Sequence, residues 1–271
     1  MTDREDDATL VAGLEAAIER DMIAPWFQPV MCPGGVEMLS AEALPRWDDP
    51  VRGVVPAGVF IDVAIRHGML ARISRILMDK ACANFAGWRE RGIAPLCVSV
   101  NLTGAELRSP ESIGQIRDAM EANGLAPEQI AIEIAEAVLT EPGWEASLET
   151  VRSLREIGIP FWLDDFGAGP CDAEVIARVD FALAKVDRKI VFGLEEDPAM
   201  VERLGALVAQ ARGAGMRLIA KGVETRGQID TLVALGCDGQ QGYAIARPMA
   251  EDAFAEWLDL NTWAGPVASA G

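Results

Sequence analysis

The sequence predicts an α/β fold, a modified TIM-type (β/α)8 barrel whose first two strands form an antiparallel hairpin. Three observations support this. The chain has 271 residues, of which 50% are hydrophobic, so it can bury the core of one large barrel. Eight short apolar runs alternate with longer segments of helical spacing, which is typical of a parallel sheet covered on both faces. The first two runs are joined by a link too short for a helix.

The predicted strands are short apolar runs that end close to polar residues. In chain order they cover 26–30, 38–44, 96–101, 130–134, 161–164, 181–186, 217–220 and 242–246. Helices are predicted between most of them because apolar residues recur at helical spacing, as in 201–214 and 228–235. The link between the first two strands contains Cys-Pro-Gly-Gly at 32–35, and so short a link allows only antiparallel pairing.

The chain is expected to form a single domain. Residues 1–9 are predicted to be an acidic N-terminal tail, residues 10–260 the barrel, and residues 261–271 a flexible C-terminal tail. An amphipathic helix over 8–20 is expected to lead into the first strand. We find no internal repeat or linker that would indicate a separate sensory domain.

Composition excludes several classes of function. The net charge of −18 argues against a nucleic-acid polymer as partner, because the polyphosphate would be repelled, although a small anion held by a metal ion remains compatible. Because the first residues are acidic and contain no long apolar run, we expect no secretory signal, and no apolar stretch approaches the ~20 residues that cross a bilayer. Five widely spaced cysteines without a CxxC pair indicate reduced thiols. We therefore expect a cytoplasmic protein that is not bound to a membrane.

The chain has one histidine, His67, so a histidine-rich metal site is impossible. His67 precedes Gly68, which resembles the residue that ends a helix. A histidine in the last turn, favoured by the helix dipole, is the expected structural role, and catalysis by His67 is not.

Polar residues cluster at the predicted strand ends, which meet at one mouth of a βα-barrel, where active sites lie. Carboxylates and an amide oxygen suit a hard divalent cation such as Mg²⁺ or Mn²⁺. Two adjacent aspartates at the end of a strand repel each other unless cations compensate them. We therefore expect a metal or phosphate site. The residues are Glu42, Asn101, Glu133, Glu136, Asp164, Asp165, Lys185, Asp187, Lys221, Glu224 and Gln241.

Eight ordered motifs spread over residues 10–258 resemble the EAL domains, which are cyclic di-GMP phosphodiesterases and their non-catalytic relatives. Each motif is weak alone, but together, in order, they are very specific. They are FQPV at 27–30, EALPRW at 42–47, VNLT at 100–103, EIAE at 133–136, DDFGAG at 164–169, KVD at 185–187, AKGVET at 220–225 and QGYAIARP at 241–248.

The resemblance implies roles for the matching residues. One metal ion would be bound by Glu42, Asn101, Glu133 and Asp164, and Asp164 would bridge to a second ion that Asp165 also binds. Lys185 would contact the attacking water, supported by Asp187, and Gln241 would orient the water network. Gln28, Leu44 and Arg46 would hold the dinucleotide, with Arg46 near a phosphate. Glu136 would anchor the loop that follows Asp165. In active members, two metal ions activate water for in-line displacement and the product is pGpG.

One departure from the pattern falls on the chemistry. The family's usual segment is AEGVE, whereas this chain has Lys221 in place of the first glutamate, a second-metal ligand and general base in active members. Two unit charges about 4 Å apart interact with about 4 kcal/mol near a protein surface, so an ammonium should weaken binding of the second ion. Lys221 is expected to pair with Asp165 and other carboxylates.

Smaller departures follow elsewhere. Pro170, Cys171 and Asp172 replace the usual YSS after the glycine-rich turn, and proline removes a backbone donor there. Pro45 stands where the family pattern has a small or aliphatic residue, and Ile65 stands where a glutamate is common.

Three functions therefore compete. The first is a domain that binds cyclic di-GMP with impaired hydrolysis. The second is an active phosphodiesterase in which Glu224 or a one-metal mechanism substitutes, although Glu224 lies three residues beyond Lys221 and its side chain is expected to point elsewhere. The third is a protein-interaction domain, with an unidentified protein partner, that no longer uses the nucleotide. The resemblance also suggests a homodimer.

Overall fold

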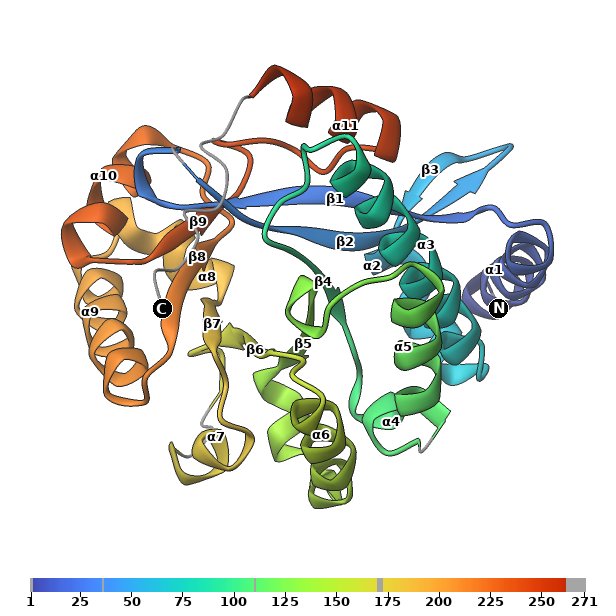
Figure 1. Cartoon of the computed structure of the whole chain (residues 1–271), viewed down its shortest axis with the longest axis horizontal. Helices are drawn as coiled ribbons and strands as arrows, with labels where there is room; N and C mark the ends of the chain where they lie inside the picture. The colour runs from blue at the N-terminus through green and yellow to red at the C-terminus, as the bar shows by residue number, and fades with distance from the viewer. Residues whose placement is uncertain (1, 36, 110, 170–172, 262–271) are drawn as a thin grey trace.

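The computed structural model describes residues 2–35, 37–109, 111–169 and 173–261. Within them the strands form one sheet in the order β1-β9-β8-β7-β6-β5-β4-β2-β3, and pairing of β1 with β2 closes eight strands into a barrel. Helices surround the strands (Figure 1). The prediction of a modified TIM-type barrel is confirmed.

The first two strands form the predicted antiparallel hairpin. Strand β1 (Ile23–Met31) is antiparallel to both of its neighbours, β2 (Met38–Asp49) and β9 (Gly239–Gln241). The remaining barrel strands run parallel to β2 and to one another. They are β4 (Cys97–Asn101), β5 (Ile130–Ala135), β6 (Phe161–Phe166), β7 (Leu183–Val186) and β8 (Arg217–Lys221).

Apart from shifts in the bounds of other strands, the structure differs from the prediction in one misplaced strand and one additional strand. The last strand, expected at 242–246, is β9 at 239–241, because Gly242 leaves the sheet and the Ala244 N–H instead donates to the Val223 carbonyl. Two glutamines in three residues gave β9 no apolar signal. Strand β3 (Gly53–Pro56) was not predicted; it pairs with the end of β2 outside the barrel.

The helices occupy the segments where helical spacing was found. Helix α1 begins at Thr2, so it also covers most of the predicted acidic tail, and α2 ends at Arg66, directly before His67, as predicted. The predicted C-terminal tail, except Asn261, lies outside the described residues. The helices are α1 (Thr2–Glu19), α2 (Ala57–Arg66), α3 (Leu70–Glu90), α4 (Gly104–Leu107), α5 (Glu111–Ala122), α6 (Ser147–Glu156), α7 (Ala173–Val179), α8 (Arg188–Phe192), α9 (Pro198–Gly213), α10 (Arg226–Leu235) and α11 (Glu251–Leu260).

Three apolar clusters hold the fold together. The largest lies between barrel and helices, and its aromatic part joins α11 to β1, since the rings of Phe27 and Phe254 have centroids 5.6 Å apart. A second cluster packs α1 and α2 against the end of β2 around Trp47 and Phe60. The third fills the barrel interior and forms the floor beneath the polar strand ends.

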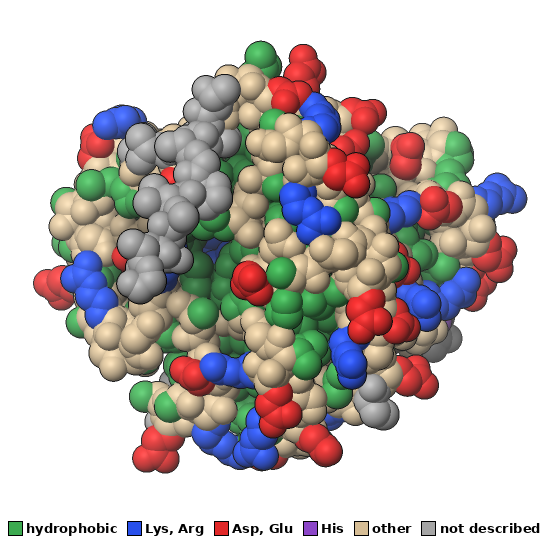
Figure 2. Space-filling view, in the orientation of Figure 1, with side chains coloured by type: hydrophobic (Ala, Val, Ile, Leu, Met, Phe, Trp, Pro, Cys, Tyr) green, Lys and Arg blue, Asp and Glu red, His purple; other side chains and the backbone are tan. Residues whose placement is uncertain are grey.

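The surface is charged without a large patch of one sign in the view of Figure 2, where acidic and basic side chains are interspersed. Among the described residues, no helix combines the length and apolar character that a bilayer-spanning helix requires.

Candidate functional site

The period of two along each strand places the predicted site residues directly above the barrel interior. Trp162, Leu183 and Ile219 are buried in the interior cluster. Two residues further along the same strands stand Asp164, Lys185 and Lys221, whose side chains therefore face the same way at the mouth. Strands β4 and β5 repeat this pattern, with Cys97 and Ala131 in the interior and Asn101 opposite Glu133 at the mouth.

Lys185 is the centre of one half of the site. Its side chain is fully buried, and its Nζ lies 2.8 Å from Glu42 Oε2 and 2.5 Å from Glu133 Oε1. Glu42 also accepts hydrogen bonds from Gln241 Nε2 at 2.7 Å and Asn101 Nδ2 at 3.1 Å. Five strands, β2, β4, β5, β7 and β9, thus contribute to one network around Glu42 and Lys185.

Lys221 is the centre of the other half. Its Nζ lies 2.7 Å from Asp164 Oδ1 and 2.5 Å from Asp165 Oδ1. The side chains of Lys221 and Asp164 are 19% and 12% exposed, so their ion pair is largely shielded from water, whereas Asp165 is 42% exposed. The predicted pairing of Lys221 with Asp165 is present, and Asp164 is its second partner.

Backbone geometry explains how two adjacent aspartates reach one lysine. Side chains at successive strand positions normally point to opposite faces. Asp165 has φ +54, a left-handed conformation rare outside glycine, and its side chain turns back to the face of Asp164. In the turn that follows, Glu136 Oε2 accepts a hydrogen bond from the Gly167 N–H at 2.7 Å. Pro170, Cys171 and Asp172 lie outside the described residues.

The surroundings shift the pKa values of these groups. Burial opposes ionisation of Glu42, but Lys185, together with Gln241, outweighs it and lowers the pKa of Glu42 to about 2. Burial and the neighbouring Glu42 raise the pKa of Glu133 to about 8. Burial disfavours the ammonium of Lys221, but Asp164 and Asp165 outweigh burial and raise its pKa. Lys221 therefore remains protonated at neutral pH.

A cavity of ≈ 670 Å³ opens beside these networks. Of the predicted site residues, it is lined by Gln28, Glu42, Leu44, Lys221, Glu224 and Gln241. Glu224 therefore contributes to the cavity wall. Asn101, Glu133, Asp164, Asp165 and Lys185 do not line the cavity; they are linked to it through Glu42 and Lys221.

Three predicted residues have local partners in the structure. Gln28 is buried, accepts from Gln241 Nε2 at 3.3 Å and donates to the Ala246 carbonyl at 2.9 Å. Arg46 donates to the Pro45 carbonyl, and its guanidinium lies 5.8 Å from the Trp26 ring centroid. Asp187 caps α8 by accepting from the Lys189 N–H at 2.7 Å. The described contacts of Asp187 do not include Lys185, which it was expected to support.

Comparison with known proteins identifies the family. A family model described as "EAL domain" matches residues 12–248. The chain belongs to the EAL domain family. The bifunctional diguanylate cyclase/cyclic di-GMP phosphodiesterase MucR of Pseudomonas aeruginosa is 30% identical over 246 residues, which are 90% of this chain and 36% of MucR. The oxygen sensor protein DosP of Escherichia coli is 30% identical over 249 residues, 92% of this chain and 31% of DosP.

Solved structures of EAL domains have the same fold. The PaMucR phosphodiesterase in complex with c-di-GMP superposes with a TM-score of 0.86 at 29% sequence identity and covers 91% of this chain and 99% of that one. The chain spans about a third of the length of the curated relatives that it matches. Its barrel thus corresponds to one EAL domain within those longer proteins.

The donor set of this EAL domain fits one divalent cation better than two. Glu133 Oε2 is buried without a hydrogen-bond partner among the described residues, as expected for an oxygen that awaits a cation. The site has four carboxylates, which face the two ammonium groups of Lys185 and Lys221. When all six groups are ionised, a net charge of −2 remains, which one divalent cation neutralises. No three or more described His, Cys, Asp or Glu side chains form a ready metal cluster. Lys221 already occupies the space between Asp164 and Asp165.

Sequence reasoning missed six residues of the cavity wall. Two are the glycines Gly222 and Gly242, and the other four, from α8 and the segment after β9, are Arg188, Lys189, Phe192 and Tyr243. The signal was present, because Arg188 and Lys189 directly follow the KVD motif and Tyr243 lies inside QGYAIARP. None of these residues ends a predicted strand, and the predicted site residues were mostly ones close to strand ends.

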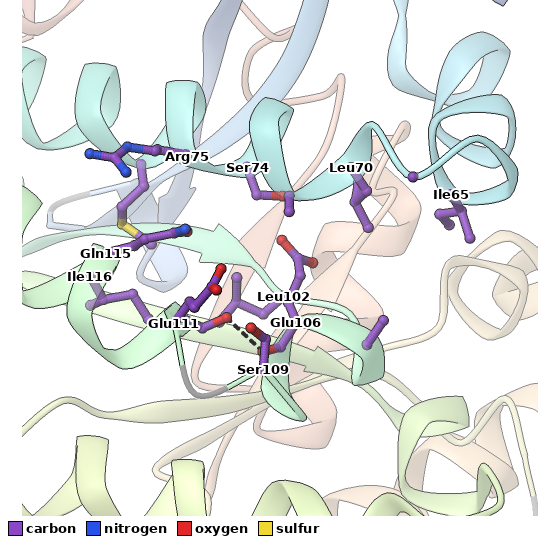
Figure 3. Close-up of a pocket in the computed structure, with 15 residues that line it drawn as sticks. Ile65, Leu70, Ser74, Arg75, Leu102, Glu106, Ser109, Glu111, Gln115 and Ile116 are labelled. Atoms are coloured by element: carbon purple, nitrogen blue, oxygen red, sulfur yellow. Dashed lines mark hydrogen bonds between the residues drawn. The ribbon is translucent and has the colours of Figure 1, made fainter.

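A second cavity, of ≈ 210 Å³, lies apart from these residues between α3, α4 and α5 (Figure 3). Leu70 and Leu102 contribute to its wall, and Glu106 is its buried acidic residue. The Glu106 carboxylate is already bonded, since Oε2 accepts from the Thr103 N–H and hydroxyl. Glu106 thus completes the capping box of α4, in which Thr103 is the N-cap residue, and this cavity contains none of the predicted site residues.

Proposed function

We propose that this EAL domain binds cyclic di-GMP in the ≈ 670 Å³ cavity and hydrolyses it poorly. The observation that carries the proposal is the position of Lys221, whose Nζ lies within 2.7 Å of both Asp164 and Asp165. An ammonium held between two aspartates takes the place of a second metal ion. Similarity to MucR, a bifunctional diguanylate cyclase/cyclic di-GMP phosphodiesterase, and to the PaMucR phosphodiesterase in complex with c-di-GMP supports the choice of ligand.

Binding is supported by the size and lining of the cavity. Its volume lies in the range of small-molecule sites. Gln28, Leu44 and Gln241, three residues of the family pattern, line it. Arg46 stands two residues beyond Leu44 on β2 and therefore faces the same side of the strand.

Poor hydrolysis follows from acid–base chemistry. One divalent ion, held by Glu42, Asn101, Glu133 and Asp164, would supply Lewis-acid stabilisation of the phosphate. Attack by water also needs a group that accepts a proton, and Lys221 is protonated because its aspartate partners raise its pKa. Lys185 can donate hydrogen bonds but cannot accept one in its protonated form, so neither lysine serves as the base.

The test combines binding with turnover on the purified chain. Isothermal titration calorimetry with cyclic di-GMP is expected to show saturable binding, while chromatography with Mg²⁺ or Mn²⁺ detects little pGpG over hours. Robust turnover would contradict the impaired-enzyme proposal. Absence of both binding and turnover would contradict use of the nucleotide and favour the protein-interaction alternative.

One observation favours a second candidate, an active phosphodiesterase that uses Glu224. Glu224 is exposed and lines the same cavity as Lys221, so a carboxylate is available at the wall. If Glu224 is the base, the native chain turns over and Glu224→Gln abolishes turnover. The homodimer and the protein partner stay predictions. Light scattering of the purified chain tests the homodimer, and affinity capture with the native chain tests the protein partner.

A further inference from the structure

The cavity has a cationic and aromatic wall that the family pattern did not assign. Arg188 and Lys189 are adjacent on α8, both are exposed, and both line the cavity. Neither forms an ion pair with a carboxylate of the described residues, although acidic residues outnumber basic ones by 42 to 24 in the chain. Adjacent cations without acidic partners, in so acidic a protein, are available for an anionic ligand.

Aromatic side chains stand in the same wall. Phe192 is 62% exposed and Tyr243 is 52% exposed, and they are the two aromatic residues among the exposed large apolar side chains of the described residues. Both line the cavity. Arg247 stacks on Tyr243 with its guanidinium carbon 4.2 Å from the ring centroid, so one face of that ring is covered and the other is available to a planar group.

Two glycines bring these side chains and Lys221 to one wall. A Cβ on Gly222 would lie 2.8 Å from the Cβ of Arg188, and Gly222 has φ +77, so only glycine allows the segment after Lys221 to pack against α8. A Cβ on Gly242 would lie 2.2 Å from backbone atoms of Val223. The wall is therefore fixed by close backbone packing, which favours a pre-formed binding surface.

We propose that Arg188 and Lys189 bind the phosphodiester groups of the ligand and that Phe192 and Tyr243 stack on its purine bases, so that nucleotide binding does not require a metal ion. This inference rests on the proposed function and adds the contacts that hold the ligand. Cyclic di-GMP offers two phosphodiester anions and two guanine rings, which match the two kinds of side chain. Arginine and lysine donate charge-assisted hydrogen bonds to phosphate, and aromatic rings stack on bases.

The test is calorimetric titration of the full chain with cyclic di-GMP in EDTA and, separately, in Mg²⁺. The native chain is expected to bind in EDTA with an affinity within about threefold of that in Mg²⁺. Arg188→Ala and Lys189→Ala are each expected to weaken binding about tenfold in EDTA, the effect of one charge-assisted hydrogen bond. Phe192→Ala and Tyr243→Ala are expected to weaken it at least fivefold through lost stacking.

Matched controls separate ligand contact from damage to the fold. Arg72→Ala removes an exposed arginine of α3, and Val233→Ala truncates an exposed apolar residue of α10. Neither residue lines the cavity, so both variants should bind cyclic di-GMP as the native chain does. Thermal melting followed by circular dichroism checks that each variant is folded. If Arg188→Ala or Lys189→Ala fails to fold, Arg188→Gln or Lys189→Gln takes its place.

The outcomes distinguish the two proposals. Binding in Mg²⁺ that vanishes in EDTA, or binding unaffected by all four wall variants, overturns the cationic and aromatic wall while the proposed function survives. No binding under either condition overturns the proposed function itself. Weaker binding of the four wall variants, with unchanged controls and persistence in EDTA, supports both.

Discussion

The Nζ atom of Lys221 lies 2.5 Å from Oδ1 of Asp165, a residue whose left-handed backbone turns its side chain toward the barrel mouth. A protein cation thus stands where the family pattern implies a metal ion, which gives a prediction about metal binding. Titration with Mn²⁺, followed by electron paramagnetic resonance, should count one bound ion for the native chain and two for Lys221→Glu. Two ions on the native chain would contradict this role for Lys221.

The anchor of the loop after Asp165 should contribute to stability. Glu136 is buried and accepts from the Gly167 N–H at 2.7 Å. Removing the carboxylate leaves that donor without its partner, so Glu136→Ala should lower the free energy of unfolding by about 1.5–3 kcal/mol. Urea denaturation measures the change, with Glu256→Ala on the exposed face of α11 as control. Equal stability of the two variants would exclude a structural role for the Glu136 hydrogen bond.

Two glycine-to-alanine substitutions should change stability in opposite directions. Gly242→Ala places a methyl group 2.2 Å from the backbone of Val223 and should destabilise the fold by about 1–3 kcal/mol or more. Gly205 lies inside α9 with open space around it, so Gly205→Ala should stabilise by about 0.4–1 kcal/mol. Thermal melts of both variants test the close packing of the segments after β8 and β9, and a stabilising Gly242→Ala would contradict it.

Thiol chemistry tests the packing of the core. Burial raises the pKa of Cys82, Cys97 and Cys237 to about 12. A thiol with that pKa is ionised in roughly one molecule in ten thousand at pH 8, and the thiolate is the reactive form. Dithionitrobenzoate should therefore modify these three slowly at pH 8 and quickly in guanidinium chloride. Fast labelling of any of them in the native chain, located by mass spectrometry, would show that the core around it is open.

Sequence patterns predicted the barrel because apolar strands and helical spacing are local signals. The antiparallel first hairpin followed from the short link alone, and the register that pairs Gln28 with Glu42 agrees with it. Strand β9 was misplaced because its buried glutamines carry no apolar signal, and the segment after it is apolar without being a strand. Its course is set by contacts of Gly242 with Val223, which are distant in sequence.

The site was predictable where its residues end strands and unpredictable where it depends on tertiary contacts. The sequence indicated that Lys221 would face carboxylates, and the structure adds that Asp164 and Asp165 share it. Burial of Lys185 between Glu42 and Glu133 required coordinates, because its separation from them exceeds 50 residues. Arg188, Lys189, Phe192 and Tyr243 join the cavity only through the packing of α8 and the segment after β9.

The proposed limit that Lys221 sets on hydrolysis can be tested by one comparison of rates. Initial rates of pGpG formation from cyclic di-GMP are measured with saturating Mn²⁺ for the native chain and for Lys221→Glu. We predict turnover at least tenfold faster for Lys221→Glu, since the substitution restores both a carboxylate ligand and a proton acceptor. A native chain that turns over as fast as Lys221→Glu, or faster, would contradict it.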